Sequence, residues 1–368
     1  MTMLSPLFKP VAFTECPGWG DDNQLEAFQA FARSAARVLE KPYKSGSLGI
    51  SFEALAPIFT DSRETLIEND EQARQFFEKW FHPARVETPE MKQGFVTGFY
   101  EPEVIASPVR TERFSVPFLS RPSDLVDVDD NNRPEALDPY FAFARQTATG
   151  LVEYFDRAAI ETGAIKDQNL EIAFVESAVD AFFIHVQGAA RLKMTDGRLR
   201  RITYAAKTGH RFTGVGKILL DRGEIPLEKM SMQAIRQWLA ENPDQAQNLL
   251  WNNRSYIFFR EAAVDDVALG PIAAAKVPLT GGRSLAVDRL LHTFGTPFYI
   301  SAPTLNAFGG KGFARLMIAQ DTGSAIVGPA RGDLFAGSGD AAGEIAGGIR
   351  HEADFYALVP RSLLAGQI

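Results

Sequence analysis

The sequence is poor in the residues and segments that mark several classes of protein. Cys16 is the only cysteine among 368 residues, so neither a disulfide framework nor a cysteine-ligated metal site can form within one chain. No apolar run reaches the length that a transmembrane helix needs. Positive charge is not in excess: the net charge is −8, which gives no reason to expect binding to nucleic acid or to an anionic membrane surface.

The first 16 residues also lack the features of an export signal. Pro6 and Pro10 interrupt this segment, and no apolar stretch follows a basic start. Cys16 lacks the preceding apolar segment of a lipid-attachment motif. We therefore expect neither a signal peptide nor a lipid anchor in this sequence.

Hydrophobic residues, phenylalanine and glycine are plentiful. Hydrophobic residues make up 45% of the chain, enough for a sizeable core, and the length suits two or three domains. The 28 phenylalanines and 30 glycines are typical of short aromatic-rich strands joined by glycine turns. In the N-terminal part of the chain, however, periodic apolar residues predict three helices. The first covers about 22–35 with Asp21 or Asp22 as its cap, and the second covers 51–58 with Ser51 as its cap. The third runs from Asp61 or Asn69 to Phe81.

From residue 94 the pattern favours strands. Residues 105–150 are expected to be loops, and 151–166, 214–224 and 231–241 to be helical. The expected strands are 94–104, 172–175, 182–192, 200–205, 252–260, 277–280, 281–288, 297–301 and 355–359. Asp196-Gly197 predicts a hairpin turn. His185 lies in an apolar run, so we expect it to be a core residue and not a ligand.

The segment 315–348 combines carboxylates with glycine turns. An apolar run leads to Asp321, Asp333 opens a second short strand, and Asp340 follows in another glycine-rich turn. Glycine lets the backbone approach a ligand closely, so two aspartates can project into one groove that holds sugar rings. The alternative is that Asp and Gly are simply turn residues here.

Five segments carry a family resemblance because they occur together and in order. They are 97–102 (TGFYEP), 186–190 (VQGAA), 253–259 (NRSYIFF), 277–288 (VPL and SLAVD), and 319–333 (AQDTGSAI through Asp333). In this order they resemble the membrane-bound lytic murein transglycosylase A family, and the resemblance extends over most of the chain after residue 90.

The resemblance implies a mainly β protein with N-terminal helices. Residues 1–103 and 253–368 would form a double-psi β-barrel catalytic domain with a helical lead-in. Residues 104–252 would form an inserted second β-barrel-like domain, with glycan in the groove between the two. The residues themselves show β texture on both sides of a distinct middle segment, but not that the first and last parts form one domain.

The reaction implied is cleavage of the β-1,4 bond between N-acetylmuramic acid and N-acetylglucosamine in peptidoglycan. The muramyl C6 hydroxyl, not water, would attack C1 and leave a 1,6-anhydro ring. Ordinary glycosidases use two carboxylates. Here the nucleophile belongs to the substrate and is held in place, so one carboxyl can serve as acid and then as base.

The family's motif assigns roles to particular residues. Asp333 is the expected acid and base, in a partly apolar pocket that raises its pKa, and Asp321 orients the site and is the backup catalyst. Asp340 stays a turn residue. The expected substrate-binding residues are Thr97, Tyr100, Gln187, Ser255 and Asp288, the last of which could instead pair with Arg289 or Arg283. No metal or organic cofactor is implied, and the five histidines show no ligand spacing such as HExxH.

The implied partner is the glycan strand of peptidoglycan, with cell-wall synthesis or division proteins as further candidates and a monomer as the expected state. The implied location is the periplasm, with outer-membrane association suggested by the family name. Two other functions stay open. One is a glycoside hydrolase in which Asp321 and Asp333 act as a pair with water. The other is a non-catalytic, expansin-like glycan-binding protein.

Overall fold

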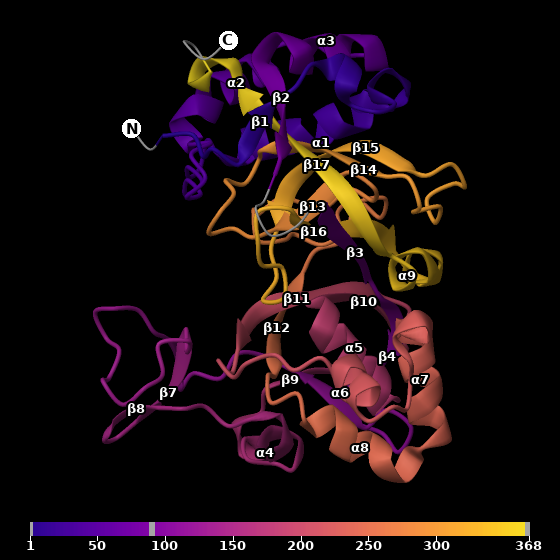
Figure 1. Ribbon diagram of the computed structural model, residues 1–368. Helices are drawn as coiled ribbons and strands as arrows, with labels where there is room; N and C mark the ends of the chain where they lie inside the picture. Colours follow the sequence, from indigo (N-terminus) through magenta and orange to yellow (C-terminus); the bar gives the residue numbers. More distant parts are fainter. Residues whose placement is uncertain (1–2, 88–92, 365–368) are drawn as a thin grey trace. The chain divides into compact units, whose positions relative to one another are not determined.

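The chain folds into two compact units. The computed structural model describes residues 3–87 and 93–364 (Figure 1). The first unit combines residues 1–100 with 266–368, and the second is the continuous stretch 101–265. The insertion expected at 104–252 lies inside the second unit. The fold is mainly β with helices, as the sequence predicted.

Three helices open the first unit: α1 (Gln24–Arg37), α2 (Phe52–Glu64) and α3 (Asp70–Trp80). Each begins after a residue whose side chain accepts a backbone N–H of the first turn. Ser51 does so for α2, as predicted, and Asn69 for α3. The cap of α1 is Asn23, so the prediction of Asp21 or Asp22 was wrong. Asp22 is engaged by an arginine instead.

An eight-stranded sheet forms the rest of the first unit, in the order β1-β2-β17-β14-β15-β13-β16-β3. Because β17 also pairs with β3, the six strands from β17 round to β3 close into a ring. This ring agrees with the predicted barrel, and the double-psi crossing stays a prediction. The strands are β1 (Phe8–Pro10), β2 (Phe81–Val86), β3 (Gly94–Glu101), β13 (Ser284–Val287), β14 (Pro297–Ala302), β15 (Phe313–Asp321), β16 (Arg331–Ser338) and β17 (Arg350–Pro360).

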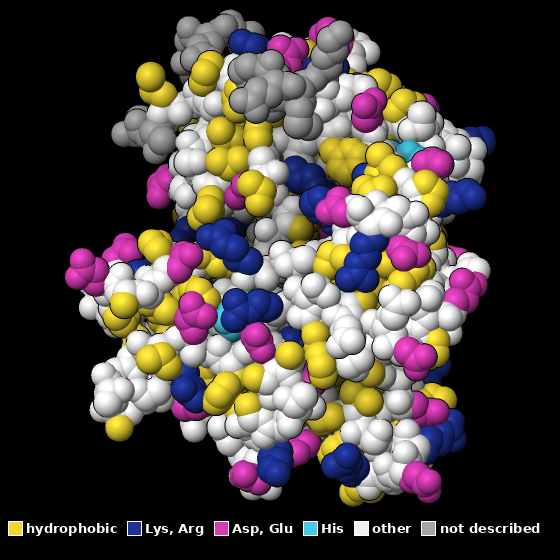
Figure 2. Space-filling model, turned by 60° about the horizontal axis from the view of Figure 1, so that its bottom comes forward, with side chains coloured by type: hydrophobic (Ala, Val, Ile, Leu, Met, Phe, Trp, Pro, Cys, Tyr) yellow, Lys and Arg dark blue, Asp and Glu magenta, His cyan; other side chains and the backbone are white. Residues whose placement is uncertain are grey.

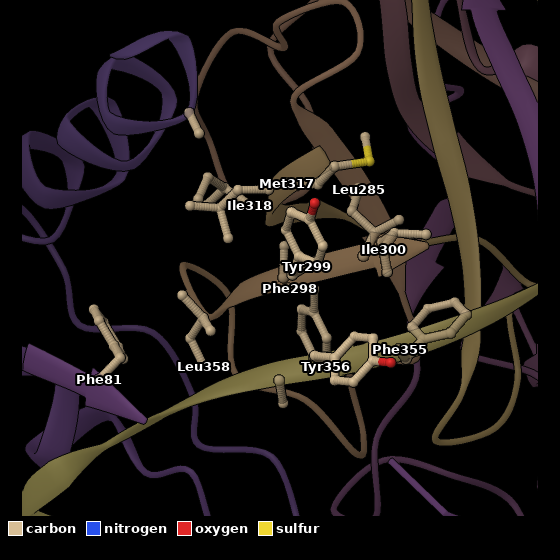
Figure 3. Close-up of a cluster of buried hydrophobic side chains, with 14 of the residues drawn as sticks. Phe81, Leu285, Phe298, Tyr299, Ile300, Met317, Ile318, Phe355, Tyr356 and Leu358 are labelled. Carbon is tan, nitrogen blue, oxygen red and sulfur yellow. The ribbon is translucent and has the colours of Figure 1, made fainter. Parts of the chain in front are cut away.

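Large apolar side chains from several of these strands meet in one buried cluster (Figure 3). Phe81 of β2, Phe298 of β14 and Leu358 of β17 are fully buried there. Phe31 of α1 joins the same cluster. The first hundred residues and the last hundred therefore share one hydrophobic core. The burial of apolar surface is the main contribution to the stability of their association.

The second unit is built on a four-stranded sheet in the order β12-β11-β10-β4. Two isolated bridges, Ser107 with Phe174 and Ser120 with Phe259, connect its edges to the pair β5–β9, giving the barrel-like ring that was expected. The strands are β4 (Glu103–Ala106), β5 (Val116–Leu119), β9 (Glu171–Val175), β10 (Ala189–Met194), β11 (Leu199–Lys207) and β12 (Ile257–Ala262).

A three-stranded sheet and five helices complete the second unit. The three strands are β6 (Leu125–Asp127), β7 (Phe143–Thr147) and β8 (Gly150–Val152). The helices are α4 (Arg157–Glu161), α5 (Ala178–Gln187), α6 (Val215–Asp221), α7 (Met232–Glu241) and α8 (Pro243–Trp251). Asp196-Gly197 makes the predicted hairpin between β10 and β11, with Gly197 at φ 86°.

Several sequence predictions were wrong. Residues 178–187 are helical, not part of a strand, because Ser177 caps α5 and Gly188 ends it in the left-handed conformation. Residues 105–150 contain three short strands, β5, β6 and β7, where loops were expected. Within 151–166, where one helix was expected, the α-helix α4 occupies only Arg157–Glu161. Residues 277–280 make a single bridge, through Pro278, and no strand.

Candidate active site

Two aspartates of the first unit lie on either side of one residue of β13. β13 pairs in parallel with β15 and antiparallel with β16. Ala286 is in register with Asp321 on β15 and with Asp333 on β16. The sheet therefore places the two carboxylates on strands that flank β13, although a glycine-rich loop separates them in sequence.

Asp333 forms a short hydrogen bond with Thr97 on the neighbouring strand β3. Thr97 Oγ1 lies 2.6 Å from Asp333 Oδ1. Burial raises the pKa of Asp333, whereas the hydrogen bond from Thr97 and the charge of Arg331 oppose that rise. Because Asp333 is only partly covered, its carboxyl can hold a proton and still be reached by a substrate.

Arg331 is a site residue that the sequence analysis missed. Its Nη2 donates to Thr97 Oγ1 at 2.6 Å, and its Nη1 donates to the carbonyl of Gly332. The guanidinium carbon lies 5.7 Å from the centre of the Phe95 ring. Residues two apart on a strand project to the same face, so the spacing of Arg331 and Asp333 was the signal available in the sequence.

The residues after Asp333 alternate between the core and the site. Leu334 is fully buried in the core of the first unit. Phe335 projects to the same face as Asp333 and packs on Phe99, with ring centres 5.2 Å apart. Since Thr97 and Phe99 also share a face of β3, an aromatic pair lies beside the Thr97–Asp333 hydrogen bond. This apolar neighbourhood favours the protonated form of Asp333.

Asp321 ends β15 and is held by backbone amides. Its Oδ1 accepts a hydrogen bond from the amide of Ala274 at 3.1 Å, and the amide of Thr322 also bonds the carboxylate. Burial raises the pKa of Asp321 to about 6, and the negative charge of Asp333 adds to the rise. Its contacts tie the chain around Ala274 to the end of β15, which is an orienting role.

Asp288 holds the loop that joins Asp321 to β16. Its Oδ2 accepts from the amide of Gly328 at 3.0 Å, and its Oδ1 accepts from the amide of Leu290. His292 supports the same loop, because its Nε2 lies 2.9 Å from the carbonyl of Pro329. Burial lowers the pKa of His292 to about 4, so the ring is neutral and donates this bond. Arg283, offered as an alternative partner of Asp288, instead binds Asp22 and Glu26.

Tyr100 packs against the helix α9 (Asp340–Gly347), which follows β16 (Figure 1). A Cβ added to Gly343 would lie 2.9 Å from Cε2 of Tyr100. Asp340 is exposed and is the first residue of α9. It therefore starts a helix, where the sequence predicted only a turn.

The comparisons with known proteins agree with the two-unit fold. A model of the MltA specific insert domain matches residues 95–260, and a model of the 3D domain matches residues 283–359. A crystal structure of the membrane-bound lytic murein transglycosylase from Agrobacterium tumefaciens aligns with 98% of this chain and 99% of its own, at 51% identity and a TM-score of 0.93. The chain belongs to the membrane-bound lytic murein transglycosylase A (MltA) family.

Two Escherichia coli relatives extend the comparison with the MltA family. The curated membrane-bound lytic murein transglycosylase A of strain K12 is 37% identical over 207 residues. This match spans 55% of the present chain and also 55% of the relative's own length, which is about half of each. The structure of E. coli MltA with bound chitohexaose aligns with 98% of this chain and 93% of its own, at 26% identity and a TM-score of 0.67.

Gln187 and Ser255 lie in the second unit, within the part matched to the MltA specific insert. Gln187 is the last residue of α5, not a strand residue, and is followed by Gly188 at φ 78°. Ser255 is buried, and its carbonyl accepts a hydrogen bond from Arg157 Nη2 at 2.7 Å. His185 is a core residue as predicted, with Nδ1 3.1 Å from Arg157 Nη1. As substrate contacts of an MltA protein, Gln187 and Ser255 remain predictions.

Three further observations concern the surface, possible metal ligands and the helices of this MltA family member. Acidic and basic side chains are interspersed over the face shown in Figure 2. Across residues 3–87 and 93–364, no group of three or more His, Cys, Asp or Glu side chains is arranged to hold a metal ion. Within the same ranges, none of the helices combines the length and hydrophobicity needed to cross a bilayer.

Proposed function

We propose that this chain is a lytic transglycosylase that cleaves the β-1,4 bond between N-acetylmuramic acid and N-acetylglucosamine in peptidoglycan and leaves a 1,6-anhydromuramic end. Membership of the MltA family supports the activity. The support from the site is Asp333, a partly exposed carboxyl whose pKa is raised by burial and whose Oδ1 is held by Thr97. A carboxyl in this state is suited to general acid catalysis.

In this reaction Asp333 first protonates the glycosidic oxygen, so that the bond to C1 breaks. The C6 hydroxyl of the same muramyl residue forms the new bond to C1, and its proton passes to the Asp333 carboxylate. The enzyme is thereby returned to its protonated state, and no water is consumed. An attacking group that is already part of the substrate removes much of the entropic barrier.

The other candidate residues take supporting roles. Asp321 accepts backbone amides that fix the chain near Ala274, which suits an orienting group better than a second catalyst. Asp288 would keep the loop before β16 in place. Tyr100 and Thr97 lie on β3, the strand next to the one that carries Asp333, and Thr97 is hydrogen-bonded to Asp333. Gln187 and Ser255, both of the inserted unit, stay proposed substrate-binding residues.

We infer that the substrate is a peptidoglycan glycan strand in the periplasm. The E. coli relative was obtained with chitohexaose, a β-1,4-linked amino-sugar chain, bound. The relatives are named membrane-bound, so association with the outer membrane is part of the proposal, as are cell-wall synthesis or division proteins as partners and action as a monomer.

Mass spectrometry of the soluble products from purified sacculi tests this function. We expect wild type to release anhydromuropeptides and Asp333→Asn to lower the rate by about 10²- to 10⁴-fold, the usual contribution of a general acid. Asp340→Asn is the matched control, since Asp340 is an exposed residue of the same segment, and it should keep the wild-type rate.

Two results would overturn the proposal in different ways. Products with reducing ends would mean that water is the nucleophile and that Asp321 and Asp333 act as a hydrolytic pair. Retained binding to sacculi without soluble products, from wild type and from Asp333→Asn alike, would mean an expansin-like binding protein.

A further inference from the structure

The contacts of Thr97 fix the direction in which its hydroxyl points. Its Oγ1 lies 2.6 Å from Arg331 Nη2 and 2.6 Å from Asp333 Oδ1. A guanidinium can only donate hydrogen bonds, and a hydroxyl has one hydrogen. Thr97 therefore accepts from Arg331, and its single hydrogen is free to point at Asp333.

We propose that Arg331 is a positioning residue that directs the Thr97 hydroxyl hydrogen onto Oδ1 of Asp333, so that Oδ2 is the oxygen that exchanges the proton with the substrate. This assignment rests on the proposed function, in which Asp333 is the acid and base. In the first step the Oδ2–H bond breaks and the glycosidic oxygen gains the proton. In the second step the C6 hydroxyl proton forms a new bond to Oδ2.

Arg331 is well held for this task. Its Nη1 donates to the carbonyl of Gly332, its Nη2 donates to Thr97, and its guanidinium carbon lies 5.7 Å from the centre of the Phe95 ring. These three contacts need a planar group with several donors, which arginine has and lysine lacks. Phe95 and Thr97 share one face of β3, so β3 supplies two of the three contacts.

The charges around Asp333 determine the sign of the expected pH effect. Arg331 faces Asp333 from β16, and Asp321 faces it from β15. The hydrogen bond from Thr97 and the charge of Arg331 both lower the pKa of Asp333, against the rise caused by burial. Loss of either contact lets Asp333 keep its proton to higher pH. The basic limb of kcat/KM, where the free enzyme loses the proton of its acid, then moves to higher pH.

The experiment is a pH profile of anhydromuropeptide release for Thr97→Val, Thr97→Ser, Arg331→Met and Arg331→Lys. We expect Thr97→Val to move the basic limb up by about one pH unit, the effect of losing one hydrogen bond to a charged group. Arg331→Met removes a nearby positive charge and the donor that directs the Thr97 hydroxyl, so it should move the limb in the same direction. Thr97→Ser, which keeps the hydroxyl, should restore the wild-type limb. Arg331→Lys keeps the charge without the planar group and should restore it only in part.

A double substitution shows whether Arg331 acts through Thr97. In a Thr97→Val background, Arg331→Met should move the limb less than it does alone, since coupled residues are not additive. Arg289→Met, at an exposed arginine after β13, is the control and should leave the limb unchanged. An unchanged limb in Arg331→Met, or full additivity with Thr97→Val, would overturn the positioning role. Absence of anhydro products from wild type would instead reject the proposed function itself.

Discussion

At the scale of single residues, the two aspartates differ in what holds them. Asp333 is bonded by a hydroxyl that a guanidinium directs, whereas Asp321 is bonded by the amides of Ala274 and Thr322. Burial raises the pKa of both carboxyls. A carboxyl with a raised pKa is useful to an acid catalyst, but above that pKa the fold must bury a charge.

This cost predicts how stability depends on pH at Asp321. Its pKa is about 6 in the fold against the ordinary 3.8, so between these values the folded state binds more protons than the unfolded state. Stability from this group is therefore present at low pH and is lost as pH rises through about 6, by about 3 kcal/mol in total. Asp321→Asn should remove this pH-dependent loss of stability, because asparagine does not ionise.

Urea denaturation at pH 4 and pH 7 measures this effect. We expect the free energy of unfolding of Asp321→Asn, relative to that of wild type, to be higher at pH 7 than at pH 4. The reason is that asparagine keeps an acceptor for the amide of Ala274 and carries no charge at either pH. Asp340→Asn, at an exposed position, should show no such change. A difference from wild type that is equal at both pH values would contradict the raised pKa of Asp321.

At the scale of elements, two glycines set how closely α9 lies against β3. A Cβ on Gly98 would lie 2.9 Å from both the Cα and the carbonyl oxygen of Ala346, and a Cβ on Gly343 would meet the Tyr100 ring. Backbone atoms cannot move aside as a flexible side chain can. The position of α9 therefore depends on Gly98, which is the neighbour of Thr97.

Gly98→Ala should force α9 away from β3. We expect a loss of about 1 to 3 kcal/mol, the usual cost of overpacking, seen as a lower melting temperature in thermal denaturation. Gly348→Ala is the control, since Gly348 has φ −92° and its nearest neighbouring atom is 3.8 Å from the added Cβ. Equal melting temperatures for the two variants would show that α9 is not tightly packed on β3.

The elements also show how far the sequence could be interpreted. Ser51 and the apolar period gave α2, and Asp196-Gly197 gave a hairpin, because both signals are local. The run 182–187 looked like a strand because its residues are aromatic and β-branched, yet α5 is buried on several sides and needs no polar face. Between 105 and 150 the strands are too short for alternation to be recognised.

The candidate site was predictable only in part for a similar reason. Asp321, Asp333 and Thr97 were found through a family resemblance, but their contacts depend on pairing between β3, β13, β15 and β16. Thr97 and Asp333 are 236 positions apart, and no local pattern encodes such a pairing. Arg331 could have been found from its spacing to Asp333 on one strand face.

At the scale of the whole molecule, each unit has its own interior. Among the described residues, the core cluster of the first unit includes none from 101–265, and the clusters of the second unit include none from outside that range. In the second unit Arg157 is buried and donates to the carbonyls of Asn253 and Ser255. These bonds join α4 to the chain that leads into β12.

Arg157→Met should therefore destabilise one unit selectively. Two buried carbonyls lose their donor, which costs about 3 kcal/mol. Differential scanning calorimetry should show the transition of the second unit at lower temperature and that of the first unchanged. Arg254→Met, at an exposed arginine that pairs with Asp156, should shift neither transition noticeably. A single transition moved as a whole by Arg157→Met would mean that the units unfold together.

The insertion of one unit into the other also imposes an order in time. A ribosome that has made β3 must make the whole of 101–265 before β13, β14, β15, β16 and β17, which complete the first sheet, can appear. At the usual 5–20 residues per second, this delay lasts about 10 to 30 seconds. Meanwhile α1, α2 and α3 can pack on one another, and β2 can pair with β1. The apolar side chains that β14, β15 and β17 later cover, the other edge of β2 and the edges of β3 still have no native partner. The nascent chain is thus most exposed to aggregation or proteolysis before its C-terminal third is synthesised.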